Sequence, residues 1–374
     1  MRVLHLHSSF NSGGKELRAA KLINAFGAGV EHTIVSGVPG ALAAAERIDP
    51  AIAVNYPEFP PLTGSLSLGR YRKLAEAMRG FDLVLTYNWG AMDAVMAHRL
   101  FAKRLGLPPL VHHEDGFNHD EAGGLKRSRN WFRRLALSTV AALVVPSKAL
   151  ERIALEKWRQ QPARVRRIAN GIALADFAKP PLANALPGLV KQTGDLWIGT
   201  LAGLRAVKNL PRLVSACSYL PPPWKLVIVG EGPERPVIEA RIAELKMQDR
   251  VFLPGHATDP AAVMGLFDLF ALSSDSEQFP ISVVEAMAAG LAIAATDVGD
   301  IQAMVTKANI PFVRNIQDES ELMVAITTLT NHPGLRTAIG AANRARARAE
   351  YGEDKMVSAY RDIYAKALGK ATFP

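Results

Sequence analysis

Short apolar runs alternate with longer amphipathic stretches along almost the whole chain. In the first half, the apolar runs predict strands at residues 2–9, 31–37, 81–87, 107–114 and 142–147. Helical periodicity lies between them, for example at residues 16–26 and 71–80. Regular alternation of strand and helix is typical of a parallel sheet that is covered by helices on both faces.

The alternation is interrupted once and then starts again. Residues 178–194, AKPPLANALPGLVKQTG, contain three prolines and two glycines and predict a linker. Further strands are predicted at residues 196–203, 225–232, 250–255, 266–274 and 291–297. A length of 374 residues suits two domains of ordinary size.

We therefore predict an α/β protein with two Rossmann-like domains. The predicted parts are a first domain at 1–178, a linker at 179–195, a second domain at 196–350 and a C-terminal helical segment at 351–374. Ligands of such sheets bind at the carboxyl ends of the strands. Candidate site residues are therefore sought where the apolar runs end.

The most informative stretch is residues 273–299, SSDSEQFPISVVEAMAAGLAIAATDVG. It predicts a short helix that has Pro280 at its first position and ends at Gly290. No strong side-chain cap precedes this helix, so the amides of Ile281, Ser282 and Val283 are expected to lack partners. Such amides attract phosphate.

Two carboxylates accompany these amides. Glu277 lies before the predicted helix and Glu285, eight residues later, lies inside it. Carboxylates repel phosphate and suit hydroxyl groups, so a nucleotide sugar fits both kinds of group. The alternative is an ordinary surface helix with Glu285 in solvent, which the apolar neighbours of Glu285 disfavour.

This pattern resembles the Glu-x7-Glu signature of retaining glycosyltransferases with the GT-B fold, especially glycosyltransferase family 4. The resemblance runs nearly end to end, and its motifs are strong only in combination. They are SGGKE at 12–16, IANGIALADF at 168–177, AGLRAVKN at 202–209, LVIVGEGPER at 226–235 and DVG at 297–299. The resemblance implies two Rossmann-like domains that face each other across a cleft, with the last helix packed back on the first domain.

In the second domain, the resemblance implies a binding site for the donor. Glu285 would hold the ribose hydroxyls, and Glu277 would hold the sugar hydroxyls. Lys208 matches a family lysine that stabilises the leaving diphosphate. The usual arginine position holds Gly203, and Arg205, two residues further on, is expected to take the arginine's role beside Lys208. Backbone and turn contacts to the donor are expected at Gly230, Gly232, Phe279, Pro280, Ile281 and Ser282.

In the first domain, the resemblance implies that the loop with Gly13 and Gly14 closes over the donor diphosphate. The family commonly has a histidine where this chain has Asp115, so either Asp115 or a neighbour such as His113 takes that hydrogen-bonding role. The acceptor is expected near Tyr87, Asn88 and Trp89.

The net charge of +9 is concentrated in one segment. Residues 121–170 contain twelve Lys or Arg and three Glu, so the rest of the chain is neutral. Basic residues interleaved with aromatic ones predict a surface for anionic lipid headgroups, and nucleic acid is not expected. The alternative is a pair of solvated helices with core aromatics. The candidate membrane residues are Arg127, Arg129, Trp131, Arg133 and Arg134.

Composition favours a cytoplasmic protein, and peripheral association with the inner face of the membrane stays open as an alternative. The lone Cys217 excludes an intrachain disulfide, and the N-terminus reads as a strand rather than a signal peptide. The longest apolar candidate, residues 135–145, is far shorter than the ~20 residues of a transmembrane helix. No Asp-x-Asp pair or His/Cys cluster with metal spacing is present, so we expect no cofactor and no metal.

We predict a retaining glycosyltransferase that moves a sugar from a nucleoside diphosphate to a hydroxyl acceptor, such as a lipid-linked or surface saccharide. The family resemblance implies front-face attack. Two alternatives remain at this point. One is an epimerase or phosphorylase acting on a related sugar, and the other is a protein that binds nucleotide sugars without turnover.

Overall fold

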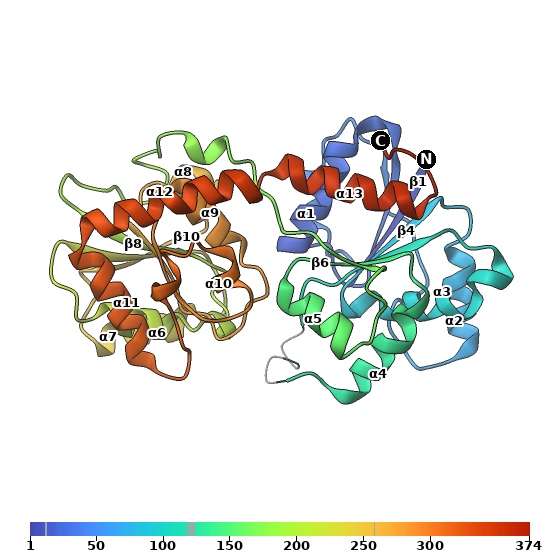
Figure 1. Cartoon of the computed structure of the whole chain (residues 1–374), viewed down its shortest axis with the longest axis horizontal. Helices are drawn as coiled ribbons and strands as arrows, with labels where there is room; N and C mark the ends of the chain where they lie inside the picture. The colour runs from blue at the N-terminus through green and yellow to red at the C-terminus, as the bar shows by residue number, and fades with distance from the viewer. Residues whose placement is uncertain (12, 118–120, 122–123, 258) are drawn as a thin grey trace. The chain divides into compact units, whose positions relative to one another are not determined.

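The computed structural model describes residues 1–11, 13–117, 121, 124–257 and 259–374. The chain divides into two compact units, and Figure 1 shows that each of them is built from strands and helices. Unit 1 comprises Met1–Asn170 and Met356–Pro374, and unit 2 comprises Gly171–Lys355.

Unit 1 is built on a parallel sheet of seven strands among the described residues, in the order β3-β2-β1-β4-β5-β6-β7. The strands are β1 (Arg2–His7), β2 (Glu31–Ser36), β3 (Val54–Asn55), β4 (Leu83–Tyr87), β5 (Leu110–His113), β6 (Ala142–Val145) and β7 (Val165–Arg167). The helices are α1 (Gly14–Phe26), α2 (Leu68–Ala77), α3 (Met92–Leu105), α4 (Arg127–Ala136), α5 (Lys148–Glu156) and, from Met356 onward, α13 (Glu353–Ala367).

Both faces of this sheet are buried. Along β1, Val3 belongs to one apolar cluster, whereas Leu4 and Leu6 belong to the cluster on the opposite face. The first cluster also contains Phe26 of α1 and Tyr364 of α13, whose rings lie 5.9 Å apart. Helix α13 therefore completes the core of unit 1.

Unit 2 repeats this design with a six-stranded parallel sheet in the order β10-β9-β8-β11-β12-β13. The strands are β8 (Leu196–Leu201), β9 (Trp224–Val229), β10 (Val251–Gly255), β11 (Leu269–Leu272), β12 (Ile293–Thr296) and β13 (Val313–Arg314). The helices are α6 (Leu210–Cys217), α7 (Arg235–Glu244), α8 (Pro260–Met264), α9 (Ile281–Ala289), α10 (Ile301–Met304), α11 (Glu319–Asn331) and α12 (Pro333–Glu350).

The prediction of two parallel-sheet α/β domains is confirmed. The unit boundary, however, lies at Asn170 rather than at residue 178, and the segment predicted as a linker belongs to unit 2. Its Leu182 amide donates to the Ala262 carbonyl of α8 at 3.2 Å, and Ile172 forms a strand-like bridge with Gly352. These backbone contacts hold residues 171–195 against unit 2.

Candidate functional site

A small pocket lies at the carboxyl edge of the sheet of unit 2. Its walls come from the ends of β8 and β11 and from the segments that follow them. It is lined by Thr200, Leu201, Ala202, Lys208, Leu210, Leu272, Ser273, Ser274, Glu277 and Ser282. Strands β8 and β11 are neighbours, yet the chain continues from β8 to β9 on one side and from β11 to β12 on the other. The pocket thus occupies the topological switch point, where doubly wound sheets bind their ligands.

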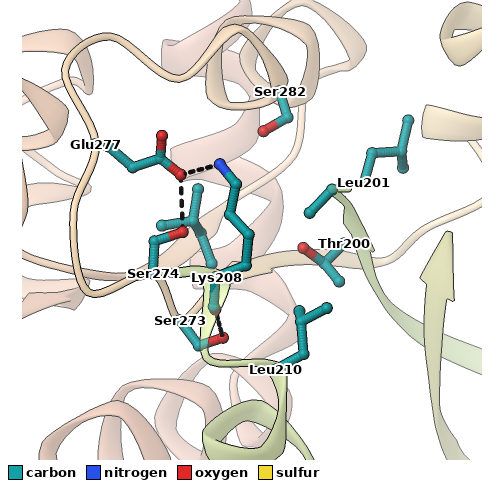
Figure 2. A pocket seen from close by; sticks show the side chains of 10 residues that line it. Thr200, Leu201, Lys208, Leu210, Ser273, Ser274, Glu277 and Ser282 are labelled. Carbon is teal, nitrogen blue, oxygen red and sulfur yellow. Dashed lines mark hydrogen bonds and ion pairs between the residues drawn. The ribbon is translucent and has the colours of Figure 1, made fainter. Parts of the chain in front are cut away.

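The centre of the pocket is an ion pair between Lys208 and Glu277. Lys208 Nζ donates to Glu277 Oε1 at 2.5 Å, and Ser274 Oγ donates to the same oxygen at 2.7 Å (Figure 2). The two charged side chains keep 24% and 11% of their surface exposed, so a ligand can reach both. The pocket therefore presents an accessible cation and an accessible anion side by side.

Local structure fixes Lys208 at this place. It ends the 3₁₀ turn Ala206–Lys208, and its carbonyl accepts from Ser273 Oγ at 3.0 Å. The next residue, Asn209, has φ 42° and caps α6 by accepting from the Arg212 amide. Asparagine tolerates this left-handed conformation better than most residues. The turn therefore aims Lys208 across the pocket while α6 starts behind it.

The loop that carries Glu277 is fixed by its neighbours. Thr296 Oγ1 donates to the Ser274 carbonyl at 2.6 Å, and the Asp300 amide donates to the Gln278 carbonyl at 3.1 Å. Gly299 has φ 61°, and a Cβ there would lie 2.5 Å from the Glu277 carbonyl oxygen. Only glycine allows this close approach, which explains the glycine of the DVG motif.

Helix α9 begins at the pocket but differs in detail from the prediction. Pro280 is the N-cap and Ile281 the first helical residue, and the Val283 amide donates to the Pro280 carbonyl at 3.1 Å. The expected lack of a partner for Val283 is therefore wrong. Among the described residues no side chain caps this helix, so Ile281 and Ser282 present its positive end. The predicted end at Gly290 is confirmed, with φ 80°.

The remaining residues of this stretch surround the pocket rather than line it. Phe279 is buried and packs edge-on against Tyr351, with ring centroids 5.7 Å apart. Glu285 lies one turn beyond Ile281 on α9 and is partly exposed. Both residues are absent from the lining set of the pocket.

The predicted turn at Gly230 and Gly232 supports the pocket from behind. A Cβ at position 230 would lie 1.9 Å from the Ala202 carbonyl oxygen, and one at position 232 would lie 2.3 Å from that of Leu204. The two glycines therefore let the loop after β9 pack against the loop after β8, whose Ala202 lines the pocket. Arg205, on the same loop, is exposed and does not line the pocket.

The predicted residues of unit 1 gather near the carboxyl ends of β1, β4 and β5. Gly13 is the N-cap of α1 and Gly14 its first residue. Asp115 accepts two hydrogen bonds from the guanidinium of Arg18, one of them at 2.8 Å to Arg18 Nη2. Burial alone would raise the pKa of Asp115, but Arg18 outweighs it and holds that pKa below its usual range. Asp115 is thus a charged, paired carboxylate.

His113 and Tyr87 are not ligand-facing groups in this structure, which corrects their predicted roles. Each keeps only 1% of its surface exposed, and their rings stack at 4.6 Å. His113 Nε2 is also hydrogen-bonded to the Tyr364 hydroxyl of α13 at 2.9 Å. Burial lowers the pKa of His113 to about 3, so the ring is neutral. Apolar and aromatic packing places both residues in the core.

Asn88 and Trp89 lie just beyond β4. Asn88 has φ 55°, and its Oδ1 accepts from the Asp115 amide at 2.8 Å, so it orders the segment that carries Asp115. Trp89 is partly buried under the guanidinium groups of Arg129 and Arg133, at 4.7 and 4.8 Å from the ring centroid. Residues 118–120, shortly after Asp115 in the chain, lie outside the described part of the structure.

Arg133 does not contribute to the surface of the basic segment. Its side chain has no exposed surface and donates to Glu121 Oε1 and Oε2 at 3.0 and 2.9 Å. Trp158, which is also buried, contacts the same guanidinium at 5.2 Å. The predicted membrane contact of Arg133 is therefore wrong, because the cation is neutralised inside the unit.

The outer face of α4 retains the other features of the basic segment. Arg127 and Trp131 are exposed, Trp131 to 66%, and Arg134 lies over the Trp131 ring at 5.0 Å. Leu135 is 49% exposed one turn further along. Arg129 is partly buried and pairs with Glu121 at 3.1 Å. An exposed tryptophan beside arginines therefore remains on this helix.

No three His, Cys, Asp or Glu side chains come together as a potential metal site in the described part of the chain. Within the same residues, no helix combines the length and the apolar character needed to cross a bilayer.

Sequence reasoning missed three groups of residues. Ser273 and Ser274 line the pocket, and their position directly after an apolar strand was an available signal. Arg18 lies in the apolar stretch of α1, and an arginine on the buried side of a helix predicts a buried partner. A second, larger pocket in unit 1, formed by residues 34–42 and 56–62, was also missed.

Two family models match the chain and together cover most of it. Glycosyltransferase Family 4 matches residues 12–176, and Glycosyl transferases group 1 matches residues 186–346. The first match contains the Gly13–Gly14 turn and Asp115. The second contains the whole pocket of unit 2.

Curated relatives are similar over parts of their length. N-acetyl-alpha-D-glucosaminyl L-malate synthase of Bacillus anthracis is 27% identical over 170 residues, or 45% of each protein. N-acetylgalactosamine-N,N'-diacetylbacillosaminyl-diphospho-undecaprenol 4-alpha-N-acetylgalactosaminyltransferase of Campylobacter jejuni is 24% identical over 290 residues, or 75% of each. The chain thus spans about half the length of the first relative and three quarters of the second.

The fold is that of known glycosyltransferase structures. HepE of Anabaena, crystallised in complex with UDP, superposes with a TM-score of 0.80 at 18% identity, covering 98% of this chain and 100% of HepE. At this identity the likeness establishes the fold alone. Together with the two family models, it shows that the chain belongs to the family 4 glycosyltransferases of the GT-B fold.

Proposed function

We propose that this protein transfers a sugar from a nucleoside diphosphate sugar to a hydroxyl group of a saccharide or lipid-linked acceptor, with retention of anomeric configuration and without a metal ion. The observation that carries the proposal is the pairing of Lys208 with Glu277 in the pocket at the switch point of the second sheet. The cation and the uncapped helix start suit the diphosphate of such a donor, and the anion suits its sugar hydroxyls.

Each part of the donor has a partner in this arrangement. The diphosphate would bind Lys208 and the amides of Ile281 and Ser282, where the positive end of α9 favours an anion. Glu277 would accept hydrogen bonds from the sugar hydroxyls, and Glu285 from the ribose. HepE binds UDP in its crystal structure, which supports a nucleotide as the ligand of this fold.

The reaction follows from these contacts. The bond between the anomeric carbon and the diphosphate oxygen breaks, and the acceptor oxygen forms a new bond on the same face of the sugar. The acceptor proton passes to the departing diphosphate, whose charge Lys208 and α9 stabilise. The Glu277 carboxylate stabilises the positive charge that develops on the sugar.

A lipid-linked acceptor is supported by two observations. The relative from Campylobacter jejuni carries diphospho-undecaprenol in the name of its acceptor. In this chain, Trp131 and Leu135 are exposed on α4 beside Arg127 and Arg134. We propose that this face, Arg127, Trp131, Arg134 and Leu135, rests on an anionic membrane.

Thermal unfolding in the presence of UDP-, GDP- and ADP-sugars tests the donor proposal. A ligand at about 100 times its Kd stabilises the folded state by ~2.7 kcal/mol, so one nucleotide series should raise Tm by about 5 °C. The same shift is expected in EDTA, because the proposal contains no metal. No shift with any of the three, or a shift that EDTA abolishes, contradicts it.

Analysis of the product separates transfer from the alternatives. With a hydroxyl acceptor, proton NMR should show a new glycoside with the anomeric configuration of the donor and one equivalent of nucleoside diphosphate. A phosphorylase would consume inorganic phosphate, and an epimerase would change the sugar without an acceptor. Donor binding with neither transfer nor slow hydrolysis would indicate a protein without turnover.

A further inference from the structure

The larger pocket of unit 1 contains none of the residues that we assign to the donor. It encloses about 550 Å³ at the carboxyl end of β2, one strand away from the switch point between β1 and β4. Small-molecule sites usually measure ~300–1,000 Å³ and lie at this edge of a parallel sheet. One wall is residues 34–40 with Leu42, and the other is residues 56–62.

The second wall is a fixed structure rather than a loose loop. Leu62 is 3% exposed and belongs to the core of unit 1, against which Phe59 also packs. Arg70 of α2 ties the end of this wall to the unit, since its guanidinium donates to the Pro61 carbonyl at 3.4 Å and to Asp93 at 2.5 Å. Three prolines within residues 57–61 restrict the backbone further. The pocket is therefore largely preformed.

The charges of the lining side chains disfavour a phosphate ligand. Its titratable side chains are Tyr56 and Glu58, and neither supplies a positive charge. Burial raises the pKa of Tyr56, so its hydroxyl remains a neutral donor and acceptor at physiological pH. A nucleotide or a diphosphate would meet only Glu58, which repels it.

The solvent exposure of the pocket walls favours a sugar over a lipid chain as the ligand. Tyr56 is 43% exposed and Val38 52% exposed, so the two walls open widely to water. A hydrocarbon chain placed here would keep much of its surface in contact with water, which removes most of the driving force for binding. A sugar ring combines apolar C–H faces with polar edges, and so it can stack on Tyr56 while its hydroxyls contact Glu58 and water.

We propose that this pocket, at the end of β2, binds a neutral saccharide unit of the acceptor, with Tyr56 as the stacking platform and Glu58 as the hydroxyl acceptor. The inference rests on the proposed function, because an enzyme that extends a saccharide must hold that saccharide apart from the donor. It assigns acceptor recognition to two segments: residues 34–40 with Leu42, at the end of β2 and just after it, and residues 56–62, between β3 and α2.

Saturation-transfer NMR on the full chain, with methyl glycosides of glucose, galactose, mannose and N-acetylglucosamine as probes, tests this pocket without donor. At least one glycoside should receive magnetisation at its ring C–H protons. Tyr56→Ala should weaken its binding about tenfold, Glu58→Gln should weaken it less, and Tyr56→Phe should retain most of it. Tyr219→Ala removes a tyrosine that is 78% exposed in unit 2 and is the matched control, which should bind as wild type.

The outcomes distinguish this inference from the function on which it rests. Equal binding by wild type and Tyr56→Ala, or no binding of any of the four probes, overturns the saccharide site. The Tm rise caused by the nucleotide sugar that stabilises wild type depends on the donor pocket of unit 2 and should be the same in Tyr56→Ala. The circular dichroism spectrum and the Tm of the variant without ligand, both close to wild type, verify that unit 1 is folded. In transfer assays the variant should raise the acceptor KM about tenfold and leave donor hydrolysis unchanged; lower hydrolysis would contradict a pure acceptor site.

Discussion

The charges of Lys208 and Glu277 neutralise each other in the pocket, and Ser274 holds the same carboxylate oxygen. A diphosphate that reaches Lys208 competes with Glu277 for the ammonium group, whereas Ser274 can keep Glu277 in place. The bound donor would therefore separate the two charges, with the cation on the leaving group and the anion beside the sugar. This division of roles predicts different effects for the two side chains.

Glu277→Gln keeps the shape of the side chain and a hydrogen-bond acceptor for Ser274, but removes the negative charge. We expect kcat to fall about 100-fold, as is typical when one electrostatic contact to a transition state is lost. The Tm rise with the nucleoside diphosphate that stabilises wild type should stay close to the wild-type value, because in the proposed complex Glu277 contacts the sugar and not the diphosphate. Initial rates and thermal unfolding measure the two effects.

Lys208→Met should lower kcat and also remove most of the Tm rise with the nucleotide, since in the proposed complex the Lys208 ammonium group binds the diphosphate before and during bond cleavage. Arg205→Ala is the matched control, because Arg205 is a cation of the same loop that is exposed outside the pocket lining. We expect less than a tenfold change in kcat for this variant. A wild-type kcat in Glu277→Gln would contradict the role of Glu277. An equal loss of kcat in Arg205→Ala and Lys208→Met would contradict the role of Lys208.

Single residues show which site features could be predicted from sequence. Lys208, Glu277 and Ser282 are near each other because strand ends of a parallel sheet meet at one edge, and this rule needs only the strand positions. The partner of Asp115 could not be predicted, because Arg18 is 97 positions away in the chain. The prediction that His113 contacts the ligand is wrong for a related reason. The sequence around His113 does not indicate that Tyr364 of α13, far along the chain, covers the ring.

At the scale of elements, α4 divides its arginines between two environments. Arg133 points into the unit and is paired with Glu121, whereas Arg127 and Arg134 flank the exposed Trp131. The number of charges along the sequence does not distinguish buried from exposed arginines, because both kinds lie on one helix. The helix periodicity places Arg127, Trp131 and Leu135 at successive turns of one face, which forms the stripe that we propose rests on the membrane.

Removing Trp131 tests this stripe directly. Trp131→Ala should reduce partitioning onto vesicles with anionic lipid about tenfold, because tryptophan is the largest side chain that this face can insert. Arg127→Gln with Arg134→Gln should cause a similar loss that grows smaller in high salt, since each arginine contributes about 1 kcal/mol near such a surface.

Flotation with vesicles of neutral and anionic lipid measures both losses. Tyr219→Ala removes an exposed aromatic residue from unit 2 and should bind as wild type. Arg133 is unsuitable for this comparison, because its removal leaves Glu121 with a lost partner inside the unit. Unchanged partitioning of Trp131→Ala would remove α4 from the membrane proposal.

The strands themselves followed the apolar runs closely, with β1, β4, β8 and β11 inside predicted segments. The missed strands, β3, β7 and β13, have only two or three residues each and lie at the edges of the sheets. Such short edge strands carry too few apolar residues to form a pattern. Their positions depend on pairing with a neighbour that is already in place.

At the scale of the whole molecule, the first unit contains an unusual concentration of buried histidine. His5 and His7 alternate with Leu4 and Leu6 on β1, so both rings lie on the side of the sheet that α1 and α13 cover. His5 is hydrogen-bonded to His32 at 3.0 Å and to the Tyr87 hydroxyl at 3.2 Å. His7 stacks on Tyr87 at 3.9 Å, and neither of its ring nitrogens has a hydrogen-bond partner among the described residues.

These rings make the stability of the protein sensitive to acid. Burial lowers the pKa of His5 and His7 well below 6.5, that of His32 to about 4 and that of His113 to about 3. In the unfolded chain the same rings titrate near 6.5, so below that pH the unfolded state binds more protons. Their contribution to stability is therefore complete above about pH 6.5 and is lost progressively toward pH 4 and below.

His7→Phe tests this dependence, because phenylalanine keeps the stacking on Tyr87 and removes the titrating nitrogens. Between pH 7 and pH 5 each fully buried histidine costs about 2 kcal/mol of stability, so the variant should lose about that much less than wild type. Urea unfolding at the two pH values measures the difference, and His256→Gln, an exposed histidine of unit 2, should behave as wild type. If His7→Phe and wild type lose the same free energy on acidification, protonation of His7 does not drive the loss, because the difference between the two proteins isolates that ring.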